Sequence, residues 1–132
     1  MGNQTETIGT AAEQAVERHT DIAEIAPEWD ELADRARAAP FLRPGWVAAW
    51  VDAFGGTPTL LAVRERGELK AVLPLVRGRA LVELPANGHT PLAGPVADGA
   101  AAVAELARAL LAAPPARTDL RALADHDPLL AA

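Results

Sequence analysis

The chain of 132 residues contains no cysteine, no serine and no tyrosine, and these absences remove whole classes of chemistry. Without cysteine there is no disulfide framework, no thiolate nucleophile and no cysteine-ligated zinc site. Without serine there is no Gly-x-Ser-x-Gly nucleophile elbow. The two common phosphate-binding patterns, Gly-x-x-x-x-Gly-Lys-[Ser/Thr] and Gly-x-Gly-x-x-Gly, are also missing. The sequence therefore gives little support to nucleophilic catalysis and contains neither of these phosphate-binding patterns.

Basic charge is scarce as well, and the net charge is −6. Residues 1–34 carry nine acids against Arg18 alone, which predicts a solvated acidic face rather than a cation site. No basic stripe exists, so we expect no nucleic-acid partner. No segment approaches ~18 uninterrupted apolar residues, so we expect no membrane span and a soluble, cytoplasmic protein.

Alanine dominates the residues that are present: there are 31 alanines, but only three tryptophans and two phenylalanines. Because alanine buries little area, the few large side chains must anchor the core. Trp29, Trp46 and Trp50 admit a second interpretation as an aromatic ligand platform, but their helical spacing favours the core.

Apolar spacing predicts three helices. Pro27 lies near the start of the first, over residues 26–38, and Pro44 begins the second, which Gly55 and Gly56 end. The third helix covers residues 100–113 and is ended by two prolines.

Between and around the helices, period-two patterns predict strands. The segments 60–63 and 69–76 read as a hairpin with Gly67 in its turn, and Pro74 predicts a bulge or break in the second strand. That second strand is apolar on both faces, so we expect it to be central. Further strands are expected at residues 15–22, 80–84, 92–96 and 117–123. Residues 1–14 are expected to form a disordered N-terminal tail. The predicted class is α+β, with helices packed on a mixed, mainly antiparallel sheet.

Three histidines are the candidates for chemistry near neutral pH. We expect His19 to be solvated and His126, between two aspartates, to lie in a frayed turn rather than in a metal site. His89 lies with Asn87 and Thr90 in "LPANGHTPLAGP", residues 84–95. This loop can serve as a binding loop or only as a turn, because proline and glycine also dominate turns for conformational reasons.

Residues 27–123 resemble a known family. The segments that carry the resemblance are Glu28-Trp29-x-x-Leu32, Pro40-Phe41-Leu42-x-Pro44-x-Trp46, the hairpin ending "LPLV", and "NGHTP". Together they are similar to the N-terminal part of the GNAT-like N-acetyltransferases of the cellulose-biosynthesis (CelD-like) type, which are related to the Fem-type aminoacyl transferases. The resemblance implies an αβα sandwich, and acyl transfer from acetyl-CoA to an amine in the full-length protein.

The resemblance also implies a cofactor loop, Arg/Gln-x-x-Gly-x-Gly/Ala after a strand, and we find no such loop here. We therefore expect residues 15–132 to form a partial N-terminal GNAT-like domain with an incomplete sheet, inactive alone. We assign no catalytic residue, cofactor-binding residue or metal ligand. Two alternatives stay open: a non-catalytic binding or interaction module, and a complete small acetyltransferase with a degenerate cofactor loop.

The resemblance places the loop after the hairpin, on the border of the acceptor cleft. Asn87, His89 and Thr90 are thus the predicted substrate-binding residues, with a small-molecule amine as acceptor. An incomplete sheet would also leave an unpaired edge strand, from which we expect self-association.

Overall fold

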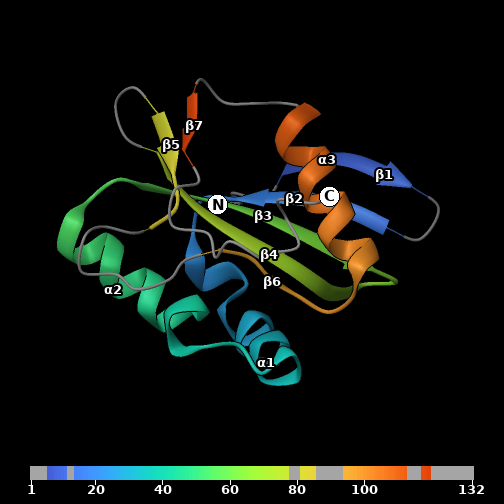
Figure 1. Cartoon of the computed structure of the whole chain (residues 1–132), viewed down its shortest axis with the longest axis horizontal. Helices are drawn as coiled ribbons and strands as arrows, with labels where there is room; N and C mark the ends of the chain where they lie inside the picture. The colour runs from blue at the N-terminus through green and yellow to red at the C-terminus, as the bar shows by residue number, and fades with distance from the viewer. Residues whose placement is uncertain (1–5, 12–13, 78–80, 86–93, 113–116, 120–132) are drawn as a thin grey trace.

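The chain folds into three layers, with one sheet between helices on both of its faces (Figure 1). The structure is a computed structural model and describes residues 6–11, 14–77, 81–85, 94–112 and 117–119. The helices are α1 (Ala26–Ala36), α2 (Pro44–Phe54) and α3 (Ala100–Ala112). The strands are β1 (Glu6–Ala11), β2 (Gln14–His19), β3 (Thr57–Glu65), β4 (Glu68–Arg77), β5 (Leu81–Glu83), β6 (Val96–Ala97) and β7 (Arg117–Asp119).

The described strands form one mixed sheet in the order β1-β2-β3-β4-β5-β7, with β6 paired to β4 beside that path. All neighbouring pairs are antiparallel except β5 and β7, which are parallel and joined through α3. The prediction of an α+β fold with a mainly antiparallel sheet is confirmed. In the part of the chain that the structure describes, no helix has the length and apolar character needed to cross a membrane.

Prolines mark the starts of α1 and α2. Pro27 lies in the first turn of α1, and α2 begins at Pro44, where a missing N–H costs nothing. Helix α1 ends at Ala36 and is capped by Arg37, which adopts the left-handed conformation (φ 54°, ψ 44°) and donates its N–H to the carbonyl groups of Ala33 and Asp34. Glycine is the usual residue in that conformation, because a Cβ atom there is crowded.

The hairpin β3–β4 turns through two residues, Arg66 and Gly67, and both have positive φ (52° and 82°). Positive φ at both positions is the geometry that matches the twist of a two-residue hairpin. The expected break at Pro74 is wrong, because Pro74 pairs in register with Leu60. On the side of β4 away from β3, Val72 pairs with β6 and Val76 pairs with β5. Pro74 lies between these two pairings, so its missing N–H leaves no described strand without a donor.

The irregularity in this hairpin lies instead at Lys70. Val63 pairs with Ala71 and Arg64 pairs with Leu69, so Lys70 is one extra residue in β4. One extra residue reverses the side to which the following positions point. Leu69 consequently packs in the cluster with α1, whereas Ala71 packs in the cluster with α3.

The expectation of a disordered tail over residues 1–14 is corrected for residues 6–11. These form β1, which pairs antiparallel with β2 and shows a register shift between Thr7 and Gly9. The segment has little apolar character of its own, and strand pairing with β2 accounts for its order. The predicted strand after it ends at His19.

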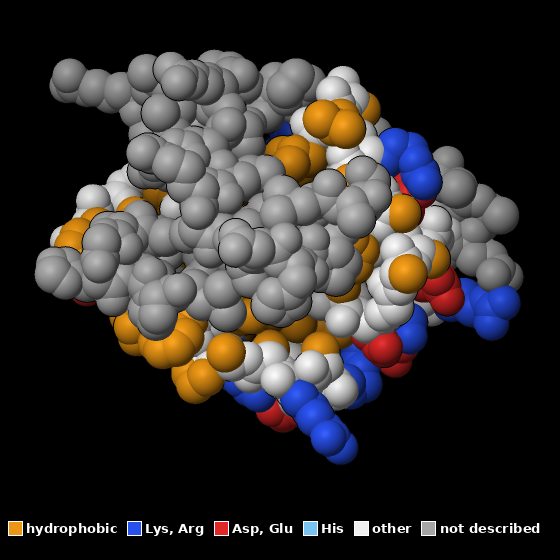
Figure 2. Space-filling model, viewed as in Figure 1, with side chains coloured by type: hydrophobic (Ala, Val, Ile, Leu, Met, Phe, Trp, Pro, Cys, Tyr) orange, Lys and Arg blue, Asp and Glu red, His pale blue; other side chains and the backbone are white. Residues whose placement is uncertain are grey.

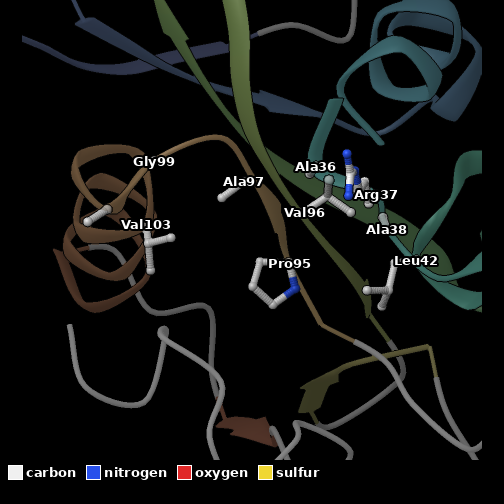
Figure 3. A pocket seen from close by; sticks show the side chains of 10 residues that line it. Ala36, Arg37, Ala38, Leu42, Pro95, Val96, Ala97, Gly99 and Val103 are labelled. Atoms are coloured by element: carbon white, nitrogen blue, oxygen red, sulfur yellow. The ribbon is translucent and has the colours of Figure 1, made fainter. Parts of the chain in front are cut away.

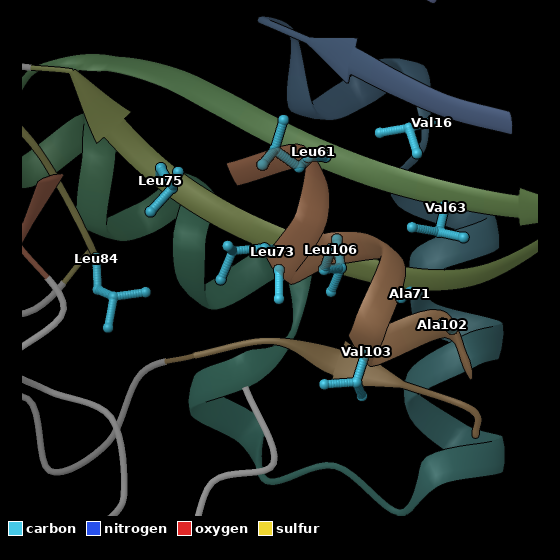
Figure 4. Packing of buried hydrophobic residues seen from close by; sticks show 12 residues of the cluster. Val16, Leu61, Val63, Ala71, Leu73, Leu75, Leu84, Ala102, Val103 and Leu106 are labelled. Carbon is cyan, nitrogen blue, oxygen red and sulfur yellow. The ribbon is translucent and has the colours of Figure 1, made fainter. Parts of the chain in front are cut away.

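Two hydrophobic clusters lie on the two faces of the sheet. Side chains from β3 and β4, among them Leu61, Leu73 and Leu75, pack against Val103 and Leu106 of α3 (Figure 4). The alternate positions of the same strands face α1 in the second cluster, whose larger members are Trp29, Leu32, Leu60, Leu69 and Val72. This confirms that β4 is buried on both faces.

Candidate functional site

A pocket of about 510 Å³ lies between the end of α1 and the start of α3, a volume typical of small-molecule sites (Figure 3). Strand β6 and Pro95 lie between its two helical walls. The α1 wall includes Ala36, Arg37 and Ala38, and the α3 wall includes Gly99 and Val103. Because the residues at the helix ends are alanine and glycine, their short side chains leave space where larger ones would fill it.

Arg37 is the one charged residue among the described lining residues. Its side chain is exposed, and in the described part of the chain it forms no ion pair. The neighbouring acids have other partners: Asp34 accepts a hydrogen bond from Arg43 Nη1 at 2.7 Å, and Asp98 lies 3.6 Å from Arg35 Nε. The pocket thus combines an apolar interior with one positive charge that these acids do not neutralise.

Hydrogen bonds to the bulge at Lys70 connect the α1 wall of the pocket with the α3 wall. Arg35 Nη2 donates to the carbonyl oxygen of Leu69 at 2.9 Å, and the Asp98 N–H donates to that of Lys70 at 2.8 Å. The Asp98 carboxylate also lies 3.5 Å from Lys70 Nζ. Two carbonyl groups at the bulge therefore bind the last turn of α1 and the residue before Gly99, which fixes the distance between the walls.

The predicted substrate residues Asn87, His89 and Thr90 lie outside the described residues, so their role stays a prediction. Both ends of their loop are described: Leu84 and Pro85 are buried, and Pro95 lines the pocket. The described C-terminal end of the loop, at Pro95, is therefore part of the pocket wall. His126 also lies outside the described residues, and no metal-binding group of three His, Asp or Glu residues occurs within them.

His19 corrects an expectation, because it is buried (3% exposed) rather than solvated. Its Nε2 lies 3.0 Å from Glu17 Oε1 and its Nδ1 lies 3.1 Å from Glu24 Oε1. Each ring nitrogen thus has a carboxylate oxygen within hydrogen-bond distance. The ring thereby joins β2 to the 3₁₀ turn η1 (Ile22–Glu24).

Part of the acidic N-terminal third is likewise bound rather than only solvated. Arg64 donates from both terminal nitrogens to Glu28, at 2.6 and 2.8 Å, and from Nε to Glu17 at 3.0 Å. The hydrogen bonds from Arg64 lower the pKa of Glu28 below its ordinary 4.5, and those carboxylates raise the pKa of Arg64. This network fastens α1 to β2 and β3.

Replacing Glu28 with glutamine should reduce the loss of stability in acid. Because the folded pKa of Glu28 lies below its ordinary value, its carboxylate stabilises the fold above that value, and the contribution disappears as the pH falls. The Glu28 side chain is 43% exposed, so we expect an effect of about 1 kcal/mol or less. Urea unfolding of both proteins between pH 7 and pH 3 measures it. A curve for the variant parallel to the parent's would contradict the assignment.

The three tryptophans do not form one ligand platform. Trp29 is fully buried and donates from Nε1 to the carbonyl oxygen of Leu42 at 3.1 Å, and Trp50 is 8% exposed. The expected role as core anchors is confirmed for these two. Trp46 is 37% exposed and packs edge-on against Phe41. Hydrophobic side chains gather on the side of the molecule where α2 lies (Figure 2).

Sequence reasoning missed the pocket and Arg37. The pocket residues are far apart along the chain, and alanine gives no signal of lining a cavity. The left-handed conformation of Arg37 depends on the chain path after α1, which no local pattern marked.

Comparison of the chain with protein-family models, with curated proteins and with solved structures found no match.

Proposed function

We propose that this chain forms the non-catalytic, acceptor-binding N-terminal part of a GNAT-like N-acetyltransferase. The observation that carries the proposal is a pocket within a three-layer αβα fold, at a strand–glycine–helix junction where Val96 stands in place of the Arg or Gln of the resembled cofactor loop. Strand β6 ends at Ala97, Gly99 has a φ of 106°, and α3 begins at Ala100. A strand that leads through glycine into a helix is the arrangement in which the resembled family holds its cofactor.

The residues at this junction also support the part of the proposal that the chain does not itself bind acetyl-CoA. Gly99 and Ala101 match the last two positions of Arg/Gln-x-x-Gly-x-Gly/Ala, but Val96 occupies the Arg/Gln position and is buried. The side chain of valine, unlike that of arginine or glutamine, has no hydrogen-bond donor for a phosphate group. The described lining also offers a single basic side chain, Arg37, for a cofactor with several negative charges.

The second candidate is a binding module without any part in acyl transfer. The observation that favours it is the chemistry of the described lining, which has no histidine, carboxylate or hydroxyl group to move a proton. Both candidates make the pocket the binding site. They differ in whether the ligand is an amine that a catalytic unit acetylates.

Thermal unfolding with added ligands tests the proposal. We expect 1 mM acetyl-CoA to leave the Tm unchanged, and at least one primary amine from a panel of amino acids, amino sugars and polyamines to raise it by several degrees through mass action. A rise with non-amine ligands alone would favour the binding module. A rise with acetyl-CoA would contradict the proposal and favour a complete small acetyltransferase.

Self-association through a free sheet edge stays a prediction, as does a cytoplasmic location. Among the described strands, β1 forms one end of the sheet. Its register shift between Thr7 and Gly9 affects how readily this edge could pair with another chain. Bulges twist an edge strand away from further pairing. Pairing of β1 with a second copy of the chain is therefore less favourable than pairing of a regular edge strand would be.

A further inference from the structure

We infer that the pocket between α1 and α3 takes a ligand with an apolar body and one carboxylate, the carboxylate pairing with Arg37. The inference rests on the proposed function, which makes this pocket the binding site. It adds the chemical class of the ligand. It requires no acetyl transfer and no cofactor. The acceptor of the proposed reaction would then be an amine that also carries a carboxylate, as an apolar amino acid does.

The apolar body follows from the interior of the pocket. Ala36, Ala38, Ala97 and Val103 present hydrocarbon from three separate elements, and Leu42 closes the side toward α2 (Figure 3). Burying apolar ligand surface against them contributes about 25 cal/mol per Å². A fully polar ligand would lose its hydration here without gaining partners from these side chains.

The carboxylate follows from the charge balance around the pocket. Arg37 supplies the one charge of the described lining, and the nearby acids Asp34 and Asp98 are engaged by Arg43, Arg35 and Lys70. An ammonium group placed beside Arg37 would be repelled. A carboxylate can accept two parallel hydrogen bonds from a guanidinium group, which fixes its orientation as well as its position.

The backbone at Arg37 allows a clean test. Its φ of 54° suits glycine better than arginine, so Arg37→Gly removes the charge without straining the chain, and its Tm should equal or exceed that of the parent. Arg37→Asn, which also tolerates this conformation, serves as a second variant. Arg108→Ala is the matched control, since it removes an exposed positive charge from α3 at a residue that does not line the pocket.

The experiment is a titration of the ¹⁵N-labelled chain followed by amide chemical shifts, with hexanoate, hexanamide and hexylamine as probes. We expect saturable shifts at Ala97, Gly99 and Val103 with hexanoate, an affinity about five-fold weaker for hexanamide, and no saturation with hexylamine. Arg37→Gly and Arg37→Asn should lower the hexanoate affinity about five-fold to the level of hexanamide, whereas Arg108→Ala should leave it unchanged.

Equal affinities for hexanoate and hexanamide would overturn the inference, as would an unchanged hexanoate affinity in both Arg37 variants or shifts confined to residues away from the pocket. These failures differ from failure of the proposed function, which shows as stabilisation by acetyl-CoA or as the absence of any amine ligand. A chain that binds hexanoate through Arg37 but no amine would keep the inference and lose the proposed function.

Discussion

Replacing Trp29 with alanine is expected to lower the free energy of unfolding by about 3–5 kcal/mol, the range for removing a large buried aromatic side chain. Trp29 is 0% exposed and packs with Leu32, Leu60 and Val72 in the cluster beneath α1. The variant also leaves the carbonyl oxygen of Leu42 without the indole donor.

Urea unfolding followed by far-UV circular dichroism measures this loss, and Trp46→Ala is the matched control. Trp46 is 37% exposed, so its removal should cost much less than that of Trp29. Similar losses for the two variants would show that Trp29 does not anchor the core in the way described.

Replacing Gly56 with alanine is the second change with a large expected effect. Gly56 joins α2 to β3 with a φ of 95°. A Cβ atom added at this position would clash with Cγ1 of the buried Val76. Left-handed backbone costs a non-glycine residue about 1–2 kcal/mol, and overpacking a core typically costs about 1–3 kcal/mol more. We therefore expect a loss of about 2–5 kcal/mol in the free energy of unfolding.

Gly45→Ala is the control for this second prediction. Gly45 lies in the first turn of α2, and nothing stands within 4 Å of the position of an added Cβ atom. Alanine there should be neutral or slightly stabilising, because it favours the helix. Equal stabilities of the Gly56→Ala and Gly45→Ala proteins in urea would contradict the close approach of Gly56 to β4.

Features fixed by neighbouring residues could be predicted from the sequence. Pro44 predicts the start of α2, and the hairpin turn at Gly67 follows from a glycine between two apolar segments. Burial of β4 on both faces also follows from its unbroken apolar run, since a strand with one wet face alternates.

Features that depend on a distant partner could not be predicted. Strand β1 is ordered by its pairing with β2, and the contact of His19 with Glu24 depends on how η1 packs against β2. The bulge at Lys70 leaves no mark in the local pattern, because Leu69 and Ala71 are both apolar whichever face they occupy. The pocket depends in turn on that bulge, so its walls and Arg37 emerge only in three dimensions.

The central claim is that this chain contributes a binding pocket at the start of α3 but does not hold acetyl-CoA there. Titration of the ¹⁵N-labelled chain with acetyl-CoA to 2 mM tests it most directly. The account predicts no saturable change in the amide resonances of Gly99, Ala100 and Val103. Saturable shifts at these three residues would contradict it, because they would show that the chain binds acetyl-CoA at this junction.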